Sequence, residues 1–71
     1  MKLKLASASR FTCGDLVTVK SLDESKHFCI IAIRHEENQE PIAVLKALFN
    51  ETYIIEKPLT ELKSLLIKGK L

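Results

Sequence analysis

The sequence predicts a mainly β domain, a small barrel of four to five antiparallel strands with a short C-terminal helix. First, a Gly14-Asp15 pair opens a run in which Val17 and Val19 alternate with their neighbours, the pattern of a tight turn feeding a half-buried strand. Second, three further runs rich in β-branched and other apolar residues follow, separated by polar segments. Third, the chain finishes in a leucine-rich tail with helical spacing, which accounts for the helix.

The first strand is expected at about 15–20, before a polar loop at 21–26. The second, at about 27–34, is apolar on both faces, which is typical of a central or doubly covered strand. A polar loop at 35–41 precedes the third strand, at about 42–48. A helix at 42–50 is the main alternative, because alanine and leucine favour helices, but the short length and the flanking turns favour a strand. We expect Asn50 to take a positive φ angle in a turn before the fourth strand, at about 52–56.

The tail after the fourth strand is predicted to be helical over about two to three turns. Pro58 suits the first turn of a helix and Gly69 is a candidate stop. The apolar stripe of this helix consists of Leu59, Leu62, Leu65 and Leu66.

Length and composition indicate a single domain with a rich core. The chain has 71 residues, of which 46% are hydrophobic. We expect more apolar surface than one small barrel can hide, and therefore a homo-oligomer or a docked partner.

Charge is distributed unevenly along the chain, although the net charge is only +2. Residues 1–10 carry three bases and no acid, whereas 11–56 carry more acids than bases. We interpret 1–10 as a flexible basic arm or added edge strand, and 11–71 as the barrel domain. No apolar run approaches the roughly 20 residues that span a bilayer, and the first residues do not resemble a secretory leader. A soluble cytoplasmic protein without a membrane partner is therefore expected.

The residues that could ligate a soft metal are Cys13, His27, Cys29 and His35. Their spacing is irregular and contains no Cys-x-x-Cys pair, and a thiol in an apolar strand is usually inert. No phosphate-binding glycine loop, nucleophile elbow or cluster of carboxylates against an apolar wall is present in the sequence. We therefore expect unpaired thiols, no metal, no cofactor and no enzyme activity.

The order of these features resembles the SH3-like small β-barrel. The resemblance covers about residues 11–66 and rests on Phe11, Gly14-Asp15-x-Val17-x-Val19 and Glu61-Leu62-x-x-Leu65. It implies that Phe11 packs ahead of the Gly-Asp turn and that the alternate valines face the barrel interior. Such barrels have many unrelated functions, so the resemblance implies a fold and no single activity.

The function we expect is that of a non-catalytic protein-interaction module, and a small accessory or inhibitory protein fits this size. An apolar strand face would be buried against a second copy or another protein. The residues predicted to form it are Ile31, Ile33, Leu45 and Ile55.

The alternative function is nucleic-acid binding, since small barrels bind strands through a basic groove with exposed aromatic residues. Phe49 and Tyr53 are the aromatic residues expected to be exposed. The residues predicted for this function are Lys2, Lys4, Tyr53, Lys63 and Lys68. The acidic body of the chain makes a protein partner the favoured interpretation.

Overall fold

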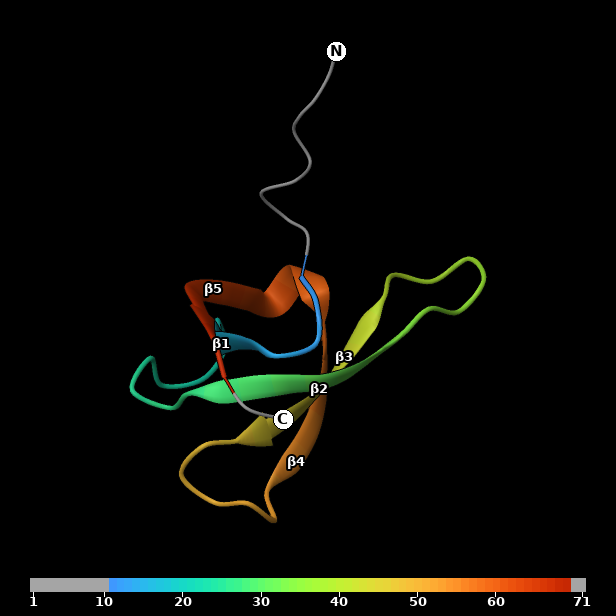
Figure 1. Ribbon diagram of the computed structural model, residues 1–71. Helices are drawn as coiled ribbons and strands as arrows, with labels where there is room; N and C mark the ends of the chain where they lie inside the picture. Colours follow the sequence, from blue (N-terminus) through green and yellow to red (C-terminus); the bar gives the residue numbers. More distant parts are fainter. Residues whose placement is uncertain (1–10, 70–71) are drawn as a thin grey trace.

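The computed structural model describes residues 11–69, which form five β-strands and one short 3₁₀ turn (Figure 1). The strands are β1 (Asp15–Val19), β2 (Phe28–Arg34), β3 (Ile42–Ala47), β4 (Ile54–Pro58) and β5 (Leu62–Lys68), with the 3₁₀ turn η2 (Leu59–Glu61) before β5. The mainly β class and the four predicted strands are therefore confirmed, and β3 replaces the alternative helix at 42–50. The arm predicted at 1–10 lies outside the described residues.

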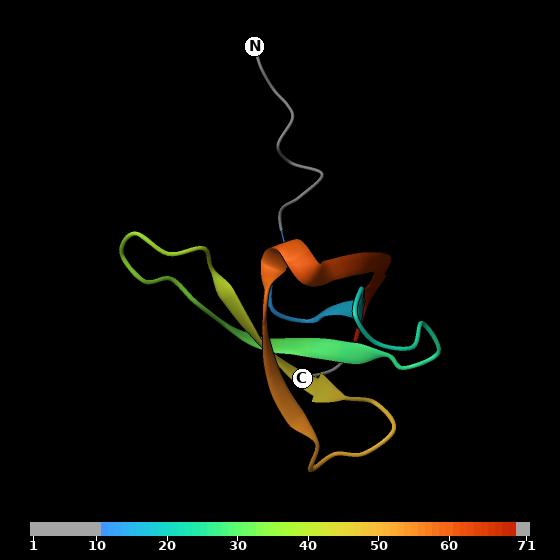
Figure 2. The ribbon, with the colours of Figure 1, turned by 180° about the vertical axis from the view of Figure 1, so that it is seen from behind.

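All five strands belong to one antiparallel sheet with the order β4-β3-β2-β1-β5. In both views, β2 crosses the middle of the molecule between the β3–β4 pair and the β1–β5 pair (Figure 1, Figure 2). The strand register shifts between Ile30 and Ala32 in the β2–β3 pair, and between Asp15 and Val17 in the β1–β5 pair. Because a bulge bends a strand and increases its twist, these positions allow the sheet to curve around a core.

The alternation of side chains between core and surface is clearest in β3. In β3, Ala43, Leu45 and Ala47 are buried, while the residues between them are partly exposed. The buried cluster consists of Val17, Val19, Phe28, Ile30, Ala43, Leu45, Ala47 and Leu62. Five partly buried side chains pack against it: Phe11, Leu22, Ile33, Ile55 and Leu59.

The predicted turn at Gly14-Asp15 connects β1 to both of its neighbours. Gly14 has a φ of +96°, in the left-handed region that glycine occupies without a steric penalty. Its N–H donates to the Ile30 carbonyl of β2 at 2.8 Å. The Asp15 carboxylate accepts a hydrogen bond from the Thr12 N–H at 2.9 Å and pairs with the Lys68 ammonium of β5 at 2.6 Å. The turn therefore orients β1 between β2 and β5.

The predicted C-terminal helix is wrong, because within residues 11–69 only η2 is helical and the leucine-rich tail forms β5. β5 runs antiparallel to β1, with Leu62 opposite Val19 and Ser64 opposite Val17. Helix propensity is a weak preference, and this pairing supplies backbone partners that β1 would otherwise lack on that side. No helix in the described part of the chain is long and apolar enough to cross a membrane.

β4 and β5 are the edge strands of the described sheet, and both have features that discourage further strand pairing. β4 is five residues long and ends at Pro58, which has no N–H to donate. β5 carries Lys63 and Lys68, and the irregular pairing with β1 includes Leu66, whose φ is +62°. Short edges, lysines, prolines and bulges are common protections against edge-to-edge association. Both edges of the described sheet therefore disfavour the addition of a further strand.

Candidate interaction surface

Exposed apolar side chains gather at the turn between β3 and β4. Six large hydrophobic residues of the described chain are exposed, and four of them lie within 48–54. We call these four the hairpin patch; their exposed fractions range from 39% to 52%, and they are Leu48, Phe49, Tyr53 and Ile54. Exposed large apolar side chains that gather in one segment commonly mark an interaction site.

Hydrogen bonds from Asn50 fix the turn that carries the hairpin patch. The Asn50 side-chain oxygen accepts from the Thr52 N–H at 3.0 Å and from the Thr52 hydroxyl at 2.8 Å. The Tyr53 N–H donates to the Asn50 carbonyl at 3.0 Å. Asn50 is not among the positive-φ residues of the described chain, so its predicted backbone conformation is wrong. Its side chain, rather than a left-handed backbone, organises the turn.

The two aromatic rings of the patch are anchored on a buried ring. The centroid of Phe28, which is fully buried, lies 5.8 Å from that of Phe49 and 6.1 Å from that of Tyr53. The Phe49 and Tyr53 centroids are 5.6 Å apart, and the Lys26 ammonium lies 5.0 Å from the Phe49 centroid. Tilted and edge-to-face pairs at these distances stabilise one another, and the lysine adds a cation–π contact. The patch therefore presents two aromatic rings that pack on Phe28, next to the positive charge of Lys26.

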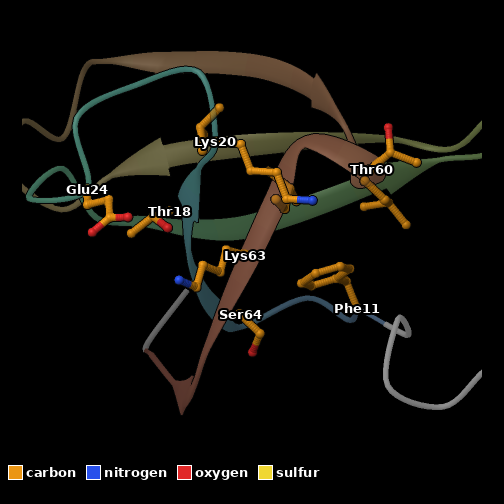
Figure 3. Close-up of a pocket in the computed structure, with 10 residues that line it drawn as sticks. Phe11, Thr18, Lys20, Glu24, Thr60, Lys63 and Ser64 are labelled. Carbon is orange, nitrogen blue, oxygen red and sulfur yellow. The ribbon is translucent and has the colours of Figure 1, made fainter.

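A second feature is an open groove of about 850 Å³, which we call the β1–β5 groove (Figure 3). In Figure 3, Phe11 and Thr60 lie on one side of β5, and Thr18 and Glu24 lie on the other. The apolar part of the lining consists of Phe11, Val19, Leu59 and Leu62, and the polar part of Thr18, Lys20, Glu24, Thr60, Lys63 and Ser64.

The charges around the β1–β5 groove are mixed. Lys20 and Lys63 are exposed, and neither forms an ion pair within residues 11–69. Glu24 is the one carboxylate of the lining. Two more carboxylates lie next to lining residues: Glu40 accepts a hydrogen bond from the Thr60 hydroxyl of the lining at 3.0 Å, and Glu61, between Thr60 and Leu62 in the chain, accepts one from the Ser21 hydroxyl at 3.3 Å. The groove has local positive charges without a strongly basic surface.

The structure separates the four residues predicted to form an apolar contact face. Leu45 is fully buried in the core, and Ile33 and Ile55 pack against it. Ile31 is partly exposed at the bulge of β2. These side chains therefore serve mainly to hold the sheet together, and the exposed apolar surface lies elsewhere, at the hairpin patch.

The residues predicted for nucleic-acid binding are not brought together either. Lys63 lines the β1–β5 groove, whereas Lys68 pairs with Asp15. Tyr53 belongs to the hairpin patch, which lies at the other end of the molecule from η2 in both ribbon views (Figure 1, Figure 2). Lys2 and Lys4 lie outside the described residues.

The two cysteines differ in accessibility. Cys13 is exposed and Cys29 is buried, and burial raises the pKa of the Cys29 thiol. Within 11–69, no group of three or more His, Cys, Asp or Glu side chains is placed to hold a metal ion. The absence of a metal and of a disulfide stays a prediction.

Comparison of the chain with protein-family models, curated proteins and solved structures gives no match. The sequence correctly marked Phe49 and Tyr53 as exposed aromatic residues, but Leu48 and Ile54 were missed. The available signal was the apolar pair Leu48-Phe49 placed directly before Asn50, where a turn residue brings its neighbours to the surface.

Proposed function

We propose that this protein is a non-catalytic protein-interaction module built on an SH3-like small barrel, and that its contact surface is the hairpin patch. The barrel is supported by five antiparallel strands in one bulged sheet. It is also supported by Phe11, which packs on the core ahead of the Gly14-Asp15 turn, and by the two fully buried valines Val17 and Val19. These are the placements that the resemblance implies.

The observation that carries the proposed function is the concentration of exposed apolar side chains within 48–54. Aromatic residues are the side chains that most often dominate binding energy at protein interfaces. Here they are oriented by a buried ring, so little conformational freedom would be lost on binding. Because both sheet edges disfavour strand addition, the partner would bind through side-chain burial.

Nucleic-acid binding is the less favoured function on the same evidence. Of its predicted residues within 11–69, Lys68 pairs with Asp15, and Tyr53 lies in the β3–β4 turn whereas Lys63 lies on β5. A phosphate-binding surface needs clustered cations that are free to replace counterions. Acidic side chains border the one groove that contains Lys20 and Lys63.

The proposal is tested first by self-association of the full chain. Sedimentation equilibrium and concentration-dependent NMR shifts would be measured for the unmodified protein, for Phe49→Ser and for Ile67→Ser. Ile67 is the matched control, because it is apolar and exposed to a similar extent (59% against 52% for Phe49) but lies outside the patch. We expect association that centres on 48–54, weakens in Phe49→Ser and persists in Ile67→Ser.

A partner other than a second copy is tested by crosslinking in the native cell. A photo-reactive phenylalanine analogue would replace Phe49 in one chain and Glu37, in the polar β2–β3 loop, in another. A defined adduct from position 49 that position 37 does not give would support the proposal. A protein that remains monomeric at millimolar concentration and gives no such adduct would refute it.

A further inference from the structure

We propose that the β1–β5 groove is a second binding site, which accepts an acidic peptide segment of a partner protein. One apolar side chain of the segment would lie on Phe11 and Leu59, and its carboxylates would pair with Lys20 and Lys63. This inference shares with the proposed function only the premise that the partner is a protein. It concerns different residues from those of the hairpin patch.

The apolar part of the groove can receive a side chain. Phe11 and Leu59 are partly buried, so each packs against the core and still exposes apolar surface to the groove. Beneath them, Val19 and Leu62 are buried in the core and make the lining rigid. Apolar lining with a few placed polar groups is the usual composition of a ligand site.

The polar part of the groove favours carboxylates. Lys20 and Lys63 have no ion-pair partner in the part of the chain that the structure describes. Glu24 in the lining and the neighbouring carboxylates of Glu40 and Glu61 keep their negative charge, because a hydrogen bond from a hydroxyl does not neutralise a carboxylate. The groove therefore favours an anion only where its carboxylates lie against the two ammonium groups, and ion pairs at a partly desolvated surface add specificity to apolar burial.

The same charges select among occupants. Residues 1–10 of the chain are joined to Phe11 but carry three bases and no acid, so they would repel the two lysines. A second copy offers the acidic loop at 35–40, which contains no apolar residue to fill the lining. A nucleic acid would need a row of cations, whereas the groove supplies two, with Glu24 among them. A segment of another protein with alternating acidic and apolar residues satisfies both parts of the groove.

The test uses three short capped peptides in which leucine alternates with glutamate, glutamine or lysine, titrated into the full chain. We expect the glutamate peptide to bind best and to shift the amide signals of the groove residues. The double variant Lys20→Glu/Lys63→Glu should reverse the preference between the glutamate and lysine peptides, changing their affinity ratio by about tenfold, as two surface ion pairs allow. Lys57→Glu, on β4 and outside the groove lining, is the control and should leave the preference unchanged.

Several results would overturn the inference. No binding of any peptide, equal binding of the glutamate and glutamine peptides, or an unchanged preference in the double variant would each do so. Tighter binding of a polythymidine strand with a steep salt dependence would instead assign the groove to nucleic acid. Preserved NMR dispersion of each variant guards against loss of fold. Phe49→Ser should leave peptide binding unchanged, so failure of this site and failure of the hairpin patch are distinguishable.

Discussion

The strength of self-association through the hairpin patch can be worked out from the exposure of its side chains. Each of the four residues is about half exposed. Full burial of such a side chain stabilises by about 1.5–3 kcal/mol, so the remaining half contributes about 1 kcal/mol. Two copies that bury all four side chains would gain about 8 kcal/mol, and association costs at least about 4 kcal/mol. The net gain is therefore at most about 4 kcal/mol, so the dissociation constant should be about 1 mM or weaker.

Phe49→Ser removes one of these four side chains from each copy. The paired surfaces then lose about 2 kcal/mol, so association should weaken by about thirtyfold. A concentration series by sedimentation equilibrium and NMR between about 0.1 and 5 mM covers the expected range. Equal association of the unmodified protein and Phe49→Ser would refute the reasoning. A dimer with a low-micromolar dissociation constant would also refute it, because the patch is too small to supply that energy.

Three further predictions concern stability and reactivity. Gly14→Ala should lower the free energy of unfolding by about 1–2 kcal/mol in a urea titration, because φ is +96° there, although space exists for the methyl group. An unchanged midpoint would contradict this. Burial alone would raise the pKa of Asp15, but hydrogen bonds from Lys68 and the Thr12 backbone and the lysine charge lower it below 3.8. The carboxylate therefore stabilises the fold above that pH and loses its contribution as the pH falls through the lowered pKa. Asp15→Asn should thus cost about 1 kcal/mol or less at pH 7 and nothing in strong acid, and a cost that persists there would contradict the ion-pair explanation. Cys13 should react at once with a thiol reagent, and Cys29, 2% exposed, only on unfolding; equal native rates would contradict that assignment.

The strands could be predicted from the sequence because their signal is local. Turn residues flank each apolar run, and apolar residues recur at every second position in the sequences of β1 and β3. The secondary structure of the tail could not be predicted from local signals. Its leucines fit helical spacing, while Leu62, Lys63 and Ser64 also fit a strand. The pairing of β5 with β1 decides between the two, and that contact joins segments more than 40 residues apart in the chain. Local propensity does not contain this information.

The predicted contact face is divided between the core and the surface for a related reason. Strict alternation along β2 would put Ile31 and Ile33 on one face and Ile30 on the other. The bulge between Ile30 and Ala32 changes that relation, so Ile30 is buried and Ile33 also packs against the core. A one-residue change of register moves every later side chain to the opposite face. Apolar content could therefore be counted from the sequence, but it could not be assigned to the inside or the outside.

The hairpin patch and the β1–β5 groove occupy different parts of the sheet. The patch extends from the β3–β4 turn, whereas the groove is formed by β1, β5, η2, the segment before β1 and the start of the β1–β2 loop. Lys26 of that loop contacts Phe49, but the patch and the groove lining have no residue in common. In both ribbon views η2 and the β3–β4 turn lie at opposite ends of the molecule (Figure 1, Figure 2). A small domain with two separate contacts can link two proteins, or gain affinity for one partner that reaches both. Phe49→Ser and Lys20→Glu/Lys63→Glu separate these cases: if the sites bind two proteins, each variant should weaken binding of one partner only, whereas a single partner that reaches both sites should be weakened by either variant.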